Sequence, residues 1–135
     1  MKPHISLAIA SFVSVLLLSF HLADDIVRGF SPGGPSNVVG ILIMVVWLYG
    51  TFLVLAERRS GYVIVLLLSL LGSVVPVIHM RGAGLAGGRL AHSTGQFFFI
   101  WTLLAVGATT IFSVILSARG LWASLRTHRG VLPSR

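Results

Sequence analysis

The sequence has no cysteine and very few charged residues. Of its 135 residues, three are acidic and ten are Lys or Arg, whereas 56% are hydrophobic and the mean hydropathy is +0.97. Without cysteine, the chain has no disulfide framework, no thiolate metal site and no thiol nucleophile. Soluble domains carry roughly a quarter charged residues, and so short a chain cannot hide this much apolar surface from water. The composition therefore predicts a membrane protein.

Asp, Glu, Lys and Arg are missing altogether from four apolar stretches, at residues 5–23, 38–56, 62–78 and 97–116. Each stretch is close to the roughly 20 residues that a helix needs to cross about 30 Å of hydrocarbon. The alternation of apolar and polar residues that membrane strands show is also absent. The sequence predicts an all-α, polytopic membrane protein with one domain, 1–135, and four transmembrane helices in an antiparallel bundle, at about 5–27, 37–57, 61–80 and 95–118.

The basic residues divide unevenly between the two sides of such a bundle. Three lie on one side, Arg28, Arg81 and Arg89, and seven on the other, Lys2, Arg58, Arg59, Arg119, Arg126, Arg129 and Arg135. Positive residues favour the cytoplasmic side, so both termini are predicted to lie in the cytoplasm. The net charge of +7 is then explained by membrane topology, without nucleic acid as a partner. We expect a multi-pass protein of a prokaryotic cytoplasmic membrane, since the chain is compact and has no glycosylation sequon.

The first stretch is predicted to remain a transmembrane helix rather than to be cleaved as a signal peptide. His21 lies two positions before Ala23, where a cleavage site requires a small residue, and the stretch is longer than a typical signal core. Between the second and third helices, residues 57–61 form so short a connection that the two helices are predicted to be an antiparallel hairpin. The pattern G-x-G-x-x-G at residues 82–87 is not interpreted as a dinucleotide-binding site, because a membrane helix precedes it and no acidic residue follows it.

Polar residues gather where the first apolar stretch ends. Four of them share one side of a helix, at spacings of three, four and seven: His21, Asp24, Asp25 and Arg28. The same stripe runs back through two serines, Ser14 and Ser11, so this face is predicted to point into the bundle. Ionisable groups near a membrane interior are costly and usually have a partner or a function.

The topology brings two further histidines to the same end of the bundle, His79 after the third helix and His92 before the fourth. The predicted metal ligands are His21, Asp24, Asp25, His79 and His92. Imidazole and carboxylate ligands suit a divalent metal such as Zn, Fe, Ni or Mn. Haem between His21 and His79 is a second possibility, ranked lower because haem ligation does not need the neighbouring carboxylates. The simpler interpretation, which the sequence favours, is that these side chains only end a helix at the membrane interface.

Three functional classes remain open from the sequence. The first, which the sequence favours, is a membrane protein that acts through association, either as a homo-oligomer or with a partner protein of a membrane complex. The second is a metal-dependent enzyme, or a metal or haem carrier, with an outward-facing His/Asp site. The third is transport, for which four helices offer enough room only in a dimer. Whether the protein is an enzyme does not follow from the sequence.

Overall fold

The computed structural model describes residues 2–31, 33–80 and 95–129. In this part of the chain all regular structure is helical, in the order α1 (Pro3–Val27), α2 (Pro35–Leu55), α3 (Arg59–Met80) and α4 (Gln96–Arg129). Each helix is long and apolar enough to cross a membrane. The predicted all-α, four-helix class is confirmed.

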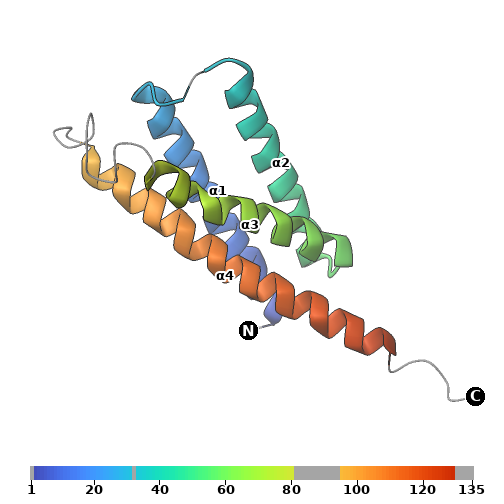
Figure 1. Ribbon diagram of the computed structural model, residues 1–135. Coiled ribbons are helices and arrows are strands. Elements are labelled where there is room, and N and C mark those ends of the chain that lie inside the picture. The colour runs from blue at the N-terminus through green and yellow to red at the C-terminus, as the bar shows by residue number, and fades with distance from the viewer. Residues whose placement is uncertain (1, 32, 81–94, 130–135) are drawn as a thin grey trace, which may run out of the picture.

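The helices form an antiparallel bundle in which α1 and α3 lie diagonally and each packs against both α2 and α4. Figure 1 shows that α3 and α4 run side by side, whereas α2 leans away from α3 beyond the turn that joins them. The start of α1 and the end of α4 lie at the same end of the bundle. The α1–α2 connection and the end of α3 lie at the opposite end, which we call the distal end.

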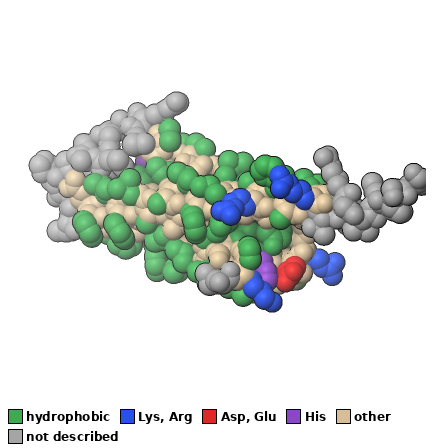
Figure 2. Space-filling model, turned by 90° about the horizontal axis from the view of Figure 1, so that it is seen from below, with side chains coloured by type: hydrophobic (Ala, Val, Ile, Leu, Met, Phe, Trp, Pro, Cys, Tyr) green, Lys and Arg blue, Asp and Glu red, His purple; other side chains and the backbone are tan. Residues whose placement is uncertain are grey.

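The surface of the bundle is suited to lipid. Large apolar side chains from all four helices are exposed, and hydrophobic side chains are spread along the whole face shown in Figure 2. Lys and Arg side chains on this face lie in the half of the molecule where α4 ends. Such exposure is unfavourable in water and neutral in hydrocarbon, so the four apolar helices belong in a lipid bilayer.

Two of the helix ends are closed by backbone hydrogen bonds that fix the chain direction. At the end of α1, the Phe30 N–H donates to the Asp25 carbonyl, with Gly29 in the left-handed region at φ +69°. At the end of α2, the Arg58 N–H donates to the Leu53 carbonyl, with Glu57 at φ +55°. Both arrangements are Schellman motifs. The second motif turns the chain directly into α3, which confirms the predicted hairpin.

The fourth helix is longer than the sequence predicts. The predicted helix ends near residue 118, but α4 continues to Arg129 and extends past the other helices. Gly120 does not interrupt the helix, because the Tyr62 ring of α3 packs directly against it. The Arg126 guanidinium lies 4.5 Å from the centre of the Trp122 ring in this extension, a cation–π contact.

A buried polar network joins α1 to α2 in the middle of the bundle. The Trp47 indole N–H donates to Ser11 Oγ at 2.9 Å, and Ser11 Oγ lies 2.6 Å from Thr51 Oγ1. Thr51 donates its own proton to the Trp47 carbonyl, so Ser11 must be the donor to Thr51. The prediction that the serine stripe of α1 faces inward is confirmed, since Ser11 and Ser14 are fully buried.

Replacing Ser11 with Ala is expected to destabilise the fold by about 1–2 kcal/mol, because the Trp47 N–H loses its acceptor and Thr51 loses a donor at a buried position. The measurement is the free energy of unfolding in mixed detergent micelles titrated with dodecyl sulfate. Ser73→Ala is the control, since the Ser73 hydroxyl is exposed and bonds only within its own helix. Equal effects of the two substitutions would contradict a stabilising role for the network.

Candidate metal centre

Three of the predicted ligands meet at the distal end of the bundle. His21 and Asp25 are one turn apart on α1, so they share a face, and His79 occupies the last turn of α3. One donor atom from each residue lies within 4.8 Å of the other two. His21 is 2% exposed, and the side chains of Asp25 and His79 are 14% and 24% exposed. The cluster therefore lies between helices and not on the lipid-facing surface.

The donor atoms are spaced as ligands of one small ion would be. His79 Nε2 lies 3.3 Å from Asp25 Oδ2 and 3.4 Å from His21 Nε2, and His21 Nε2 lies 3.8 Å from Asp25 Oδ2. Tetrahedral Zn²⁺ with ligands at about 2.0–2.1 Å has those ligands about 3.3 Å apart. Two of the three spacings match this value, and the third is only slightly longer. The triangle thus needs little adjustment to hold a metal ion.

The hydrogen bonding of His79 fixes which of its nitrogens can bind. His79 Nδ1 lies 2.9 Å from the Val75 carbonyl oxygen, which can only accept, so Nδ1 carries a proton. In neutral His79 the lone pair then lies on Nε2, which faces both Asp25 Oδ2 and His21 Nε2. Acceptor atoms this close repel one another unless a proton or a cation lies between them. A backbone carbonyl that orients a ligating imidazole is a common arrangement around protein metal sites.

Two buried atoms of the cluster have no hydrogen-bond partner in the described part of the chain, His21 Nδ1 and Asp25 Oδ1. Buried polar atoms are nearly always satisfied, and an unsatisfied one is costly. Asp25 Oδ1 is a second oxygen of a carboxylate that already faces two imidazoles. A ligand with positive charge would offset the cost of burying this carboxylate.

Aromatic rings close the cluster on the α4 side. The Phe99 ring centre lies 5.0 Å from that of His21 and 5.7 Å from that of His79. Phe30 packs edge-on against Phe99 at 5.8 Å, held there by the Schellman motif at the end of α1. These rings keep water from that side, which strengthens electrostatic interactions at the cluster.

Asp24, which the sequence also predicts as a ligand, does not belong to this group of donor atoms. Asp24 Oδ2 instead accepts a hydrogen bond from Arg28 Nε at 2.7 Å, one turn further along α1. Consecutive helical residues point about 100° apart, and here the Asp25 side chain faces His79 whereas the Asp24 side chain faces Arg28. The Asp24–Arg28 pair is locally neutral, which leaves Asp25 as the carboxylate of the cluster.

The remaining predicted ligand, His92, lies outside the described residues, as do the glycines at 82–87. Sequence reasoning missed Phe99 and the Val75 carbonyl. Neither carries a signal in the sequence, because phenylalanines and valines are common in all four apolar stretches. Comparisons of the chain with protein-family models, with curated proteins and with solved structures found no match.

Proposed function

We propose that this protein binds one divalent transition-metal ion through His21, Asp25 and His79, and that this metal centre carries its function. The observation that supports the proposal best is the triangle of donor atoms, 3.3–3.8 Å on each side, buried at the ends of two transmembrane helices. Isolated ionisable residues at this depth are costly, and three that converge on one point are a stronger sign of a ligand than any one of them.

The donor set favours Zn²⁺, Fe²⁺ or Mn²⁺. Two imidazoles and one carboxylate are ligands of catalytic zinc sites and of non-haem iron sites, whereas Ca²⁺ and Mg²⁺ prefer oxygen alone. Haem fits less well. The imidazole edges are 3.4 Å apart at Nε2 and the ring centres only 4.7 Å apart, so a flat macrocycle has no room between them.

Three protein ligands leave at least one coordination position for water or for a substrate oxygen, which is the pattern of catalytic rather than structural metal sites. An ion held there acts as a Lewis acid or activates a bound water. The charge balance fits this role, since neutral imidazoles and one carboxylate leave a bound divalent ion with net positive charge. We therefore favour a metal-dependent membrane enzyme over a purely structural metal site.

The test is metal content of detergent-purified protein after exposure to Zn²⁺ or Mn²⁺ and removal of free ion. We expect about one ion per chain, and we expect His79→Ala and His21→Ala to lose it, because two remaining ligands bind weakly. His4→Ala is the matched control. His4 is also a histidine of α1 close to an acidic group, Glu57 Oε1 at 3.6 Å, but it lies at the opposite end of the bundle.

Loss of the metal from the His4 variant as well, or retention by both other variants, would contradict the proposed ligand set. Cobalt(II) substitution offers a second readout, since the visible spectrum of a tetrahedral Co²⁺ centre differs from that of hydrated Co²⁺. Circular dichroism of each variant shows whether the helices are intact.

On the orientation given by the basic residues, the metal centre lies at the outer side of a cytoplasmic membrane. Association with a second copy or with a partner protein is the other candidate function. It is favoured by the exposed aromatic and β-branched side chains of α2, among them Phe52 and Val46. Apolar surface alone gives little driving force for association in lipid, so we rank it second.

A further inference from the structure

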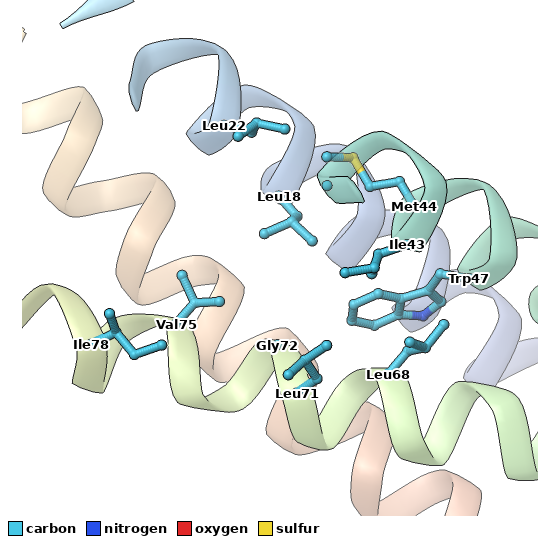
Figure 3. A pocket seen from close by; sticks show the side chains of 11 residues that line it. Leu18, Leu22, Ile43, Met44, Trp47, Leu68, Leu71, Gly72, Val75 and Ile78 are labelled. Atoms are coloured by element: carbon cyan, nitrogen blue, oxygen red, sulfur yellow. The ribbon is translucent and has the colours of Figure 1, made fainter. Parts of the chain in front are cut away.

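An apolar groove lies between α1, α2 and α3, where α2 leans away from α3. Its volume is about 280 Å³, and side chains from the three helices point into it (Figure 3). Trp47 forms its inner end beside Gly72, where the indole fits because glycine has no side chain. Leu71 and Ile78 lie at its rim and are 53% and 62% exposed, so the groove opens toward lipid.

The groove and the metal centre use the same faces of two helices. On α3, Gly72 and Val75 precede His79 by seven and four positions, and both line the groove. On α1, Leu18 and Leu22 precede Asp25 by seven and three positions. Spacings of three, four and seven place residues on one helix face. The outer end of the groove therefore lies about one helical turn from the residues of the cluster along α1 and α3.

We propose that the groove binds a single fatty acyl chain that enters from the bilayer, with the polar head of the amphiphile at the metal centre. Every side chain that lines the groove is apolar, and an apolar cavity of this kind does not hold water. The lining of α3 from Leu68 to Ile78 spans about 15 Å, a shape that suits a chain rather than a compact ligand. Acyl chains surround the open side of the groove in any bilayer.

The chemistry of the head follows from the metal centre, and this part rests on the proposed function. A divalent ion with an open position binds an oxygen donor, and a carboxylate or phosphate oxygen is the donor that amphiphiles offer. The predicted substrate class is thus a single-chain lipid with an anionic oxygen head. The head then lies at the distal end, with the chain toward the bilayer centre.

The probe is 9,10-dibromostearic acid, whose mid-chain bromines quench tryptophan fluorescence on contact. The variant W101F/W122F leaves Trp47 as the only tryptophan. Trp47 is 1% exposed and lies at the inner end of the groove, so only a chain that occupies the groove brings bromine next to its ring. In metal-loaded protein in phosphatidylcholine vesicles, we expect saturable quenching of Trp47. We expect the methyl ester of the same acid to bind about tenfold more weakly, because it lacks the charged oxygen.

Two substitutions narrow the groove from opposite walls, Leu71→Phe and Ile43→Phe. Each is expected to lower the affinity for the dibrominated acid, measured by quenching, about tenfold, because the larger side chain overfills the site. Leu70→Phe is the matched control, because Leu70 is the neighbouring residue, is similarly exposed at 46%, and does not line the groove. We expect it to leave the quenching unchanged.

Absence of saturable quenching, or equal loss with Leu70→Phe and Leu71→Phe, would overturn the groove as a chain site. Equal affinity for acid and ester would overturn the position of the head at the metal. Metal content of the same vesicles separates the two proposals. If the protein holds its ion but Trp47 stays unquenched, the metal centre stands and the lipid site is wrong. If the protein binds no metal, the proposed function is wrong, and so is the position assigned to the head.

Discussion

Replacing Asp25 with Asn is expected to weaken Zn²⁺ binding by at least about 100-fold. Removing a residue that only hydrogen-bonds a metal ligand weakens binding by up to about 100-fold, and Asp25 is proposed to be a ligand itself. Asn keeps the shape of the side chain but loses the negative charge and the anionic ligand oxygen. Asp25 Oδ2 lies 3.3 Å from His79 Nε2 and 3.8 Å from His21 Nε2, so one corner of the triangle loses the negative charge that balances the ion.

The same substitution at Asp24 provides a matched control one residue away. Asp24 pairs with Arg28 at 2.7 Å and does not face the imidazoles, so Asp24→Asn is expected to change Zn²⁺ affinity by no more than about fivefold. Competition with a chromogenic chelator measures both affinities. Equal losses at the two positions would show that the cluster attracts the ion by net charge alone, and would contradict direct coordination by Asp25.

The fold could be predicted from the sequence because lipid allows few alternatives. A backbone in hydrocarbon must satisfy its own hydrogen bonds, so four uncharged stretches of membrane-spanning length require four helices. The short connection at residues 57–61 then fixes the hairpin. That Glu57 supplies the left-handed residue of this turn could not be predicted, since glycine usually occupies that position.

The candidate metal centre was predictable in part. The four-residue spacing of His21 and Asp25 and the position of His79 at the same end of the bundle follow from helix geometry and topology. Which of the two consecutive aspartates faces inward does not follow, because it depends on how α1 is rotated against α3 and α4. Arg28, one turn after Asp24, then neutralises the aspartate that does not face His79.

The groove had no sequence signature at all. Its lining residues are ordinary members of three apolar stretches, and the space exists only because α2 diverges from α3 beyond the hairpin. Gly72 makes room for an indole only because its neighbour Trp47 comes from another helix, and that pairing cannot be read from the sequence. The angle between two helices in lipid depends on details of side-chain packing that periodicity does not report.

Gly61→Ala is expected to destabilise the fold by about 3 kcal/mol, since overpacking that cannot relax is among the costlier substitutions. A methyl group there would lie 2.5 Å from the Val54 nitrogen and 2.6 Å from the Leu53 carbonyl carbon, so the backbones of α2 and α3 would have to separate.

Gly40→Ala is the control, because its methyl group would meet only the end of the Leu22 side chain, at 3.2 Å. We expect that change to stay within about 1 kcal/mol of the wild type, since alanine also favours the helix. Dodecyl sulfate titration in mixed micelles measures both free energies of unfolding. If Gly61→Ala were as stable as the wild type, the hairpin would not hold α2 and α3 in backbone contact. The close contact from which α2 diverges to form the groove would then be absent.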